Sequence, residues 1–151
     1  MQPGPDFQAR LGAIEAALAE RDDWDVFSGL ISDLVEGARV SGLDTLPGQK
    51  LVDLDTTMGM VFNIFGQRAL QRLADWQPGR GEASSNTIDV WLSQMPGLRV
   101  VTSLPFLAGH NSGQRSTISG FCNQRYDGLI AGSTARLERL VAEFEARQSS
   151  Q

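Results

Sequence analysis

The chain has 151 residues, of which 41% are hydrophobic and 21% charged, and its formal net charge is −5. These values are typical of one folded domain that is large enough to bury a core. The acidic balance argues against broad nucleic-acid binding, because phosphates require a basic surface.

The chain has a single copy of each of four reactive residue types, His110, Cys122, Tyr126 and Lys50. Most catalysis at neutral pH uses pairs of such groups, so single copies make nucleophilic dyads and triads improbable. A zinc site of the usual type needs three or four His or Cys ligands. We therefore expect no metal site, and the composition favours a non-catalytic protein.

Charge is unevenly distributed along the chain. The first 60 residues hold eleven acidic and four basic residues, whereas no acidic residue lies between Trp91 and Tyr126. Arg99, Arg115 and Arg125 fall in that second segment. They are our candidate anion-binding residues, although a polar loop with incidental arginines explains them as well.

The sequence predicts a soluble, cytoplasmic protein. One cysteine cannot form an internal disulfide, and the first residues lack the basic start and apolar stretch of a signal peptide. The most apolar run, Met58 to Phe65, is far shorter than the ~20 residues of a membrane span. We therefore expect no membrane contact.

Two helices are predicted at the start of the chain. Apolar residues at helical spacing predict a helix from about Asp6 to Arg21 and a second from Asp23 to about Val40. The short joint between them indicates an antiparallel helical hairpin.

The strongest periodic signal runs from Leu51 to Trp76. Its apolar residues keep to spacings of three and four, which predicts a long central helix buried on more than one side. Asp53 and Asp55 would then lie on the solvated side near its start, and Pro47 agrees with a helix beginning there.

Residues 77–126 are expected to form a loop-rich insertion. It contains a loop at 77–86, a short helix at Thr87–Gln94, a strand at Leu98–Thr102 and an irregular stretch at Gly109–Gly120.

A last helix is expected from Asp127 or Ser133 to Arg147, followed by a disordered tail at 148–151. Four of its apolar residues form a heptad-like seam that is our candidate interaction surface: Ile130, Leu137, Val141 and Phe144.

The run Lys50-Leu-Val-Asp-Leu-Asp-Thr-Thr57 resembles the first motif of haloacid-dehalogenase-like phosphatases. The resemblance implies that Asp53 attacks phosphorus, that Asp55 handles the proton and that both help to hold magnesium. The segment Leu98–Ser103 is similar to the second motif, in which Thr102 would bind the phosphoryl group. The fourth motif lacks its acidic residue, because Ala131 and Gly132 stand there.

Two shorter segments resemble other families. Ser119–Ile130 is similar to part of periplasmic peptide-binding proteins, and Thr87–Gly109 is similar to part of phage capsid proteins.

Together these patterns predict one mainly α domain: a helical hairpin, a long central helix and a C-terminal helix, with a short β or irregular insertion. We expect a non-catalytic protein-interaction or assembly module, without a cofactor, that binds a protein partner or itself. The alternatives are a phosphatase-like protein, active with magnesium or inactive, that acts on a phosphorylated ligand, and a phage-type structural component.

Overall fold

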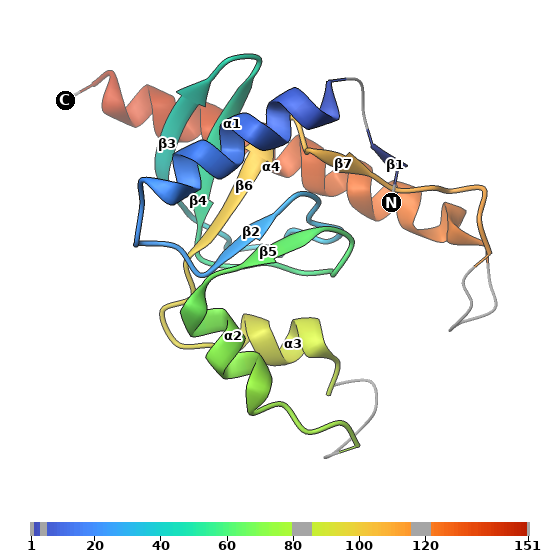
Figure 1. The fold of residues 1–151 in the computed structure, drawn as a ribbon. Coiled ribbons are helices and arrows are strands. Elements are labelled where there is room, and N and C mark those ends of the chain that lie inside the picture. Colours follow the sequence, from blue (N-terminus) through green and yellow to red (C-terminus); the bar gives the residue numbers. More distant parts are fainter. Residues whose placement is uncertain (1, 4–5, 80–85, 116–121, 151) are drawn as a thin grey trace.

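The structure is a computed structural model that describes residues 2–3, 6–79, 86–115 and 122–150. Its centre is a five-stranded mixed sheet with the strand order β3-β4-β6-β2-β5. Helix α1 covers one face of the sheet and helix α4 lies across the other (Figure 1). Parts of the loop expected at 77–86, of the irregular stretch expected at 109–120 and of the expected tail lie outside the described residues.

The elements follow one another along the chain as β1 (Gln2–Pro3), α1 (Phe7–Ala19), β2 (Val26–Ser28), β3 (Val40–Leu46), β4 (Gln49–Leu54), β5 (Asn63–Phe65), α2 (Gln67–Ala74), α3 (Ile88–Ser93), β6 (Val100–Leu104), β7 (Ala108–Gly109), a 3₁₀ turn η1 (Asn123–Tyr126) and α4 (Asp127–Gln148). Strands β2 and β6 are parallel, whereas β3–β4, β4–β6 and β2–β5 are antiparallel. Strands β1 and β7 form a separate two-stranded sheet.

The expectation of a mainly α domain is wrong, because the sheet occupies the centre of the molecule. Strand β6, which was expected inside a peripheral insertion, lies between β4 and β2 in the middle of the sheet. The protein is therefore an α/β protein, with helices packed on both faces of the sheet.

The predicted central helix is replaced by β4, a loop, β5 and α2. Leu51, Val52 and Leu54 are all buried, because successive residues of β4 face opposite sides of a sheet that is covered on both. Because Leu51 and Leu54 lie three residues apart, the buried residues of such a strand also fit helical spacing. Pro47 lies in the β3–β4 turn, where Gly48 has a positive φ of 72°.

The predicted second helix, and with it the helical hairpin, is also absent. Most of its apolar stripe is buried, with Val35 exposed, but the backbone forms β2 and then an irregular segment, residues 29–39. Tertiary hydrogen bonds take the place of helical ones: Gly29 N–H donates to Phe62 O at 2.8 Å, and Ser32 N–H donates to Met58 O at 3.0 Å. Tertiary contacts have overridden local periodicity here.

Four elements match the predictions closely: α1, α3, the strand β6 and α4. In the three helices the apolar residues lie along one side, so the local pattern is sufficient; β6 is buried on both faces, but its run of β-branched residues indicates a strand. None of the helices in the described part of the chain has the length and apolarity that crossing a membrane requires.

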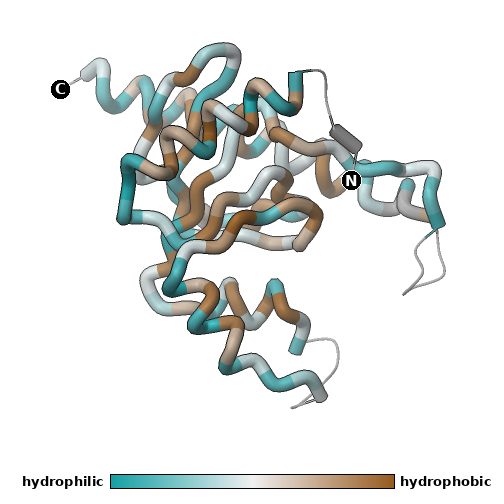
Figure 2. The backbone as a smooth tube through the Cα atoms, viewed as in Figure 1, coloured by the Kyte–Doolittle hydropathy of each residue, from teal (hydrophilic) through white to brown (hydrophobic). Residues whose placement is uncertain are grey.

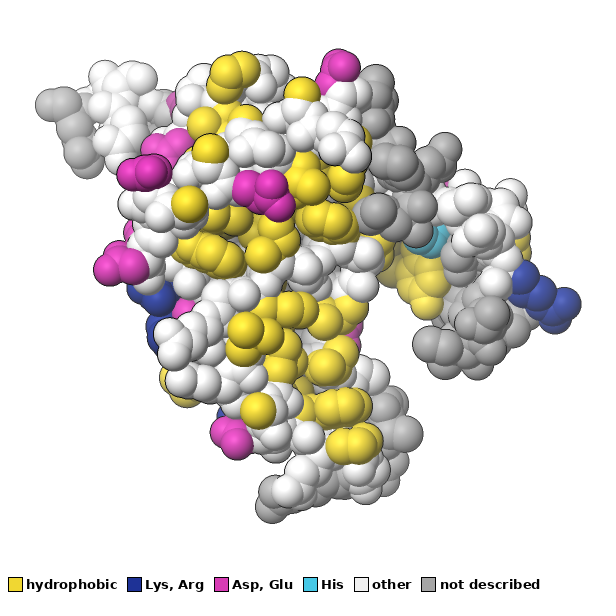
Figure 3. All heavy atoms as spheres, viewed as in Figure 1, with side chains coloured by type: hydrophobic (Ala, Val, Ile, Leu, Met, Phe, Trp, Pro, Cys, Tyr) yellow, Lys and Arg dark blue, Asp and Glu magenta, His cyan; other side chains and the backbone are white. Residues whose placement is uncertain are grey.

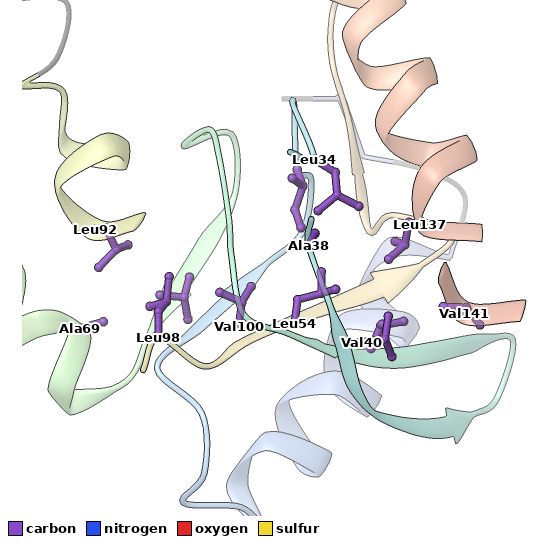
Figure 4. Close-up of a cluster of buried hydrophobic side chains, with 13 residues drawn as sticks. Leu34, Ala38, Val40, Leu54, Ala69, Leu92, Leu98, Val100, Leu137 and Val141 are labelled. Carbon is purple, nitrogen blue, oxygen red and sulfur yellow. The ribbon is translucent and has the colours of Figure 1, made fainter. Parts of the chain in front are cut away.

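The core lies on both faces of the sheet. On the α1 face, Ile14 and Leu18 pack against Phe27, Leu51 and Val101. The larger cluster on the opposite face brings α4 together with the sheet and with α2 and α3 (Figure 4); it includes Leu137, Val141, Val52, Leu54, Val100, Ala69 and Leu92.

A fully buried carboxylate joins three elements at one end of the sheet. Asp25, just before β2, accepts hydrogen bonds from the Arg99 backbone N–H at 2.8 Å and from its guanidinium at 3.3 and 3.4 Å. The guanidinium of Arg68 in α2 lies 3.4 Å from the same carboxylate. Backbone bonds from Asp25 N–H to Arg99 O and from Gly66 N–H to Asp25 O complete the junction.

We predict that Asp25→Ala lowers the free energy of unfolding by about 3 kcal/mol, because it leaves the buried Arg99 N–H and two guanidinium groups without their acceptor. Urea unfolding measures the change. The matched control is Asp23→Ala, whose side chain is 60% exposed; its effect should stay below about 1 kcal/mol. Equal effects of the two substitutions would contradict a special role for Asp25.

Candidate functional site

A pocket of about 180 Å³ lies at the end of the sheet where β4 finishes and β6 begins. It is lined by both charged and apolar residues: Arg21, Asp23, Ser41, Asp53, Leu54, Asp55, Leu98, Arg99, Val100 and Val101. The loop after α1, the start of β3 and the segment before β6 supply its walls. We call it the arginine–aspartate pocket.

Arg21 is the centre of this pocket. Its guanidinium lies 2.7 Å from Asp23, 3.3 Å from Asp44 and 2.9 Å from Asp53. The three carboxylates come from the loop after α1, from β3 and from β4, so one cation joins three segments. The Arg21 side chain is only 18% exposed, so water screens these contacts less than those of a surface pair.

The protonation of the group reflects these contacts. Burial raises the pKa of Asp53, and the hydrogen bond from Arg21 opposes that rise. The same guanidinium lowers the pKa of Asp23, mainly through its hydrogen bond. The hydrogen bond to Asp23 is the largest contribution that raises the pKa of Arg21. Asp53 therefore takes up a proton more readily than an ordinary aspartate, whereas Asp23 does so less readily.

Gly42 makes room for the Asp53 side chain. The two residues are paired across β3 and β4, directly after the bulge at the start of β3. A Cβ atom at Gly42 would lie in hard contact with Asp53 Oδ2, so no other residue fits there without a shift. The glycine thus lets Asp53 lie against the sheet and reach Arg21.

The arrangement is an ion-pair cluster with more negative than positive charge, because Arg21 is shared by three carboxylates. Each carboxylate on Arg21 already has a cation, and Asp25 holds the other pocket arginine, Arg99. Among the residues that the structure describes, no group of three or more His, Cys, Asp or Glu is placed to hold a metal ion. The chemistry that the pocket offers is proton uptake at Asp53 and ion pairing.

The structure does not bring together the residues that the phosphatase resemblance implies. Asp53 lies in a strand, but β4 runs antiparallel to β6. Thr102 is paired with Val52, so its side chain lies on the sheet face opposite to Asp53, where it is fully buried and donates to Ser28 O at 2.7 Å. Asp55 is exposed and accepts a hydrogen bond from the Arg39 backbone N–H.

Two of the three candidate anion-binding arginines, Arg99 and Arg115, lie apart. Arg99 lies before β6 and is bound to Asp25. Arg115 follows β7 and pairs with Cys122 in an isolated bridge. In Figure 1 the segment before β6 lies at the lower left of the sheet, whereas the segment after β7 runs out to the right. The side chain of Arg125 lies outside the described residues.

The single histidine lies beside α4. His110 Nδ1 is 3.6 Å from Asp127, and its ring meets Tyr126 edge to face at 5.7 Å. Cys122 is exposed, and its Sγ lies 3.2 Å from Ser112 O. These contacts attach the segment after β7 to the first turn of α4.

The expected interaction seam of α4 belongs to the protein's own core. Leu137 and Val141 are 0% and 2% exposed in the main cluster, and Phe144 packs against it. Ile130 is half-buried. The seam therefore faces the sheet and is not available to a partner.

Exposed apolar side chains occur instead at positions that sequence reasoning did not select. Val35 and Met60 are each 38% exposed, Leu129 is 47% and Leu70 is 53%. Met60 had only marked a broad apolar helix surface, so nothing in the sequence alone set it apart. We call Val35, Met60 and Leu129 the apolar docking surface, because the segments that carry them are joined by hydrogen bonds.

Figure 3 shows apolar side chains along α1 and in a second region on the face that it views. The second region covers β5, α2 and α3, although Figure 2 shows hydrophobic and hydrophilic residues alternating along α2. Apart from Leu70, its large apolar side chains are at least half-buried, as Ile64 and Trp91 are. A hollow also lies between the sheet and the arm that carries the first turns of α4, with hydrophobic side chains at its inner end.

Comparisons with protein-family models, with curated proteins and with solved structures found no match to this chain.

We predict that Arg21→Gln lowers the free energy of unfolding by about 1–2 kcal/mol at pH 7, because three carboxylates lose their shared cation. Without Arg21, the pKa of Asp53 should rise further. A carboxyl group whose pKa is higher in the folded than in the unfolded state destabilises the fold when it ionises, and this effect disappears when the group is protonated. The stability deficit of Arg21→Gln should therefore shrink as the pH falls toward 4.

Urea unfolding of wild type and variant across pH 4–8 measures this change. Arg39→Gln is the matched control, because the backbone N–H of Arg39, and not its guanidinium, binds Asp55. A deficit of Arg21→Gln that is constant over the whole range would contradict the electrostatic explanation.

Proposed function

We propose that this chain is a non-catalytic protein-interaction module that binds a protein partner through the apolar docking surface. The observation that carries the proposal is that Val35, Met60 and Leu129, three exposed large apolar residues, lie on segments that hydrogen bonds join to one another. Scattered exposed apolar residues are ordinary on a folded protein, whereas their grouping on one surface is typical of interaction sites.

Hydrogen bonds join the segments that carry these residues. The N–H of Ser32 and its hydroxyl both donate to Met58 O, at 3.0 and 3.2 Å, which ties the 29–39 segment to the loop that holds Met60. Gly59 adopts a φ of 100° against Ser32, where a Cβ would clash with its hydroxyl. The loop before β5 therefore has a defined position.

A second set of bonds attaches the same segment to α4. Leu34 N–H donates to the hydroxyl of the buried Ser133 at 2.7 Å, and the guanidinium of Arg136 donates to Leu34 O. Leu129 lies one turn before Ser133, on the side of α4 that meets this segment. Val35 directly follows Leu34, so Val35 and Leu129 lie on two segments that these bonds join.

This neighbourhood rests on a firm base. Leu34 and Leu137, directly beneath it, are 1% and 0% exposed. A surface held by the core changes little on binding, so less conformational entropy is lost when a partner docks. Completing the burial of one such side chain contributes about 1 kcal/mol, and the cluster can supply several.

The test is a site-specific cross-linking experiment. We predict that a photoreactive amino acid at position 60 captures a discrete partner in cells that express the full chain, and that Leu129→Asp abolishes the capture, because a charge is costly to bury in an apolar contact. Mass spectrometry of the adduct identifies the partner.

Leu70→Asp is the matched control, since Leu70 is also exposed and apolar but lies on α2. Capture that survives Leu129→Asp, or is lost equally in Leu70→Asp, would contradict the proposal. Urea unfolding of each variant verifies that it is folded.

A further inference from the structure

Strand β3 forms one edge of the five-stranded sheet, with β4 as its only neighbour there. It has seven residues, whereas β5 at the opposite edge has three. An edge strand presents every second backbone N–H and C=O to its surroundings, and these groups can pair with a further strand. The β3 edge is therefore the longer of the two sites where this sheet can grow.

The register shows which backbone groups of β3 point outward. Leu46 pairs with Gln49 directly across the hairpin turn, so these two residues exchange both of their hydrogen bonds. Bonded and non-bonded pairs alternate from there, which directs the N–H and C=O of Leu43 and Thr45 away from β4. Within the part of the chain that the structure describes, no hydrogen bond from outside the sheet reaches these four groups.

Helix α4 supplies a platform beside this edge. It crosses one face of the sheet, and its last turns continue past β3 (Figure 1). Lys50 of β4 pairs with Glu145 at 2.6 Å, which holds that end of α4 against the hairpin. Leu43 and Phe144 pack against the same core cluster, and both are only half-buried. A strand added at β3 would cover the remaining exposed parts of these two side chains.

We propose that the β3 edge binds an extended segment of another protein as a sixth, antiparallel strand of the sheet. In this mode of recognition the main-chain hydrogen bonds provide affinity, and alternate side chains provide specificity. The segment has apolar residues at every second position, which face Leu43 and Phe144, and polar residues between them. This site is separate from the apolar docking surface and does not depend on it.

A second copy of the chain fits the edge poorly. In a two-fold antiparallel pair, only the register that sets Leu43 opposite Thr45 uses all four outward groups of each copy. That register places the two Asp44 residues directly opposite each other, and like charges in such a pair are destabilising. A shift one way sets Leu43 opposite Pro47, which has no N–H, and a shift the other way involves the bulge at the start of β3.

The experiment uses a peptide of about ten residues, a length that exceeds β3. Valine alternates with threonine along it, because both favour strands, and a lysine at each end keeps it soluble. One version carries N-methyl groups on the valines, and a matched version carries them on the threonines. Directly opposed residues of an antiparallel pair lie on the same face, so the valines that face α4 are the residues that bond to β3.

Fluorescence anisotropy measures the binding of each labelled peptide to the full chain. We expect the unmethylated peptide to bind, and N-methylation of the valines to weaken binding at least about tenfold, because several hydrogen bonds are lost. N-methylation of the threonines should have a much smaller effect, since their N–H groups point away from β3. Equal effects of the two methylated peptides, or no binding of the unmethylated one, would overturn the proposal.

Two variants of the protein locate the bound peptide. Thr45→Pro removes an outward N–H and leaves the bonds between β3 and β4 in place, whereas Thr45→Ala keeps that N–H. The peptide should bind at least about fivefold more weakly to Thr45→Pro than to Thr45→Ala, because one hydrogen bond is lost and the proline ring obstructs the edge. Equal binding to the two would place the peptide elsewhere and overturn the proposal. Urea unfolding verifies that both variants are folded.

Amide hydrogen exchange gives a direct measure of the new bonds. The amides of Leu43 and Thr45 should exchange rapidly in the free protein and become protected when the peptide binds, whereas those of Asp44 and Leu46 are protected in both states. Unchanged exchange at Leu43 and Thr45 would contradict strand addition. Sedimentation of the wild type should show no dimer that Thr45→Pro removes; such a dimer would assign the edge to a second copy and overturn the proposal.

Discussion

The buried carboxylate of Asp25 fixes the arrangement of the whole sheet. It accepts hydrogen bonds from the main chain and side chain of Arg99, lies within ion-pair distance of Arg68, and so joins the starts of β2, β6 and α2. An unpaired charge in that position would be costly, so the three elements are constrained to meet there. Gly66 suits the same junction, because a Cβ would lie 3.0 Å from Trp24 O, a tight contact. The hydrogen bonds of Asp25 with Arg99 lie directly before the first pair of the parallel strands, Val26 with Val100, and so support their register.

The arginine–aspartate pocket beside this junction is best understood as part of the same structural system. Arg21 links the end of α1 to the β3–β4 hairpin through Asp44 and Asp53, as Asp25 links the central strands to α2. The pocket is polar because it closes the open end of the sheet, where strand ends leave backbone groups and charges that need partners. Its ion pairs account for three of the acidic residues in the N-terminal part of the chain, Asp23, Asp44 and Asp53.

Sequence periodicity predicted the elements whose environment is simple. Helix α1 has one buried stripe, with Ile14 and Leu18 against the sheet, and α4 has another. It failed in β4, which places Leu51 and Val52 on opposite faces of the sheet, because the three-residue spacing of Leu51 and Leu54 also matches a helix. It failed again in residues 29–39, whose buried leucines satisfy their backbone through Met58, Phe62 and Ser133. Those partners are distant in sequence, so no local pattern indicates them.

The same reasoning explains why the expected interaction residues and the exposed ones differ. The heptad-like seam of α4 covers the central sheet, where Leu137 and Val141 pack into the core. The side chains left over are those on segments that the fold bends out of regular structure, as Val35 and Met60 are. Their grouping with Leu129 depends on Ser32, Ser133 and Arg136, whose bonds bring two loops and a helix together. A surface of this kind exists only in the folded chain. The segments that carry Val35, Met60 and Leu129 are separated in the sequence, and none of them has a local pattern that marks it as exposed.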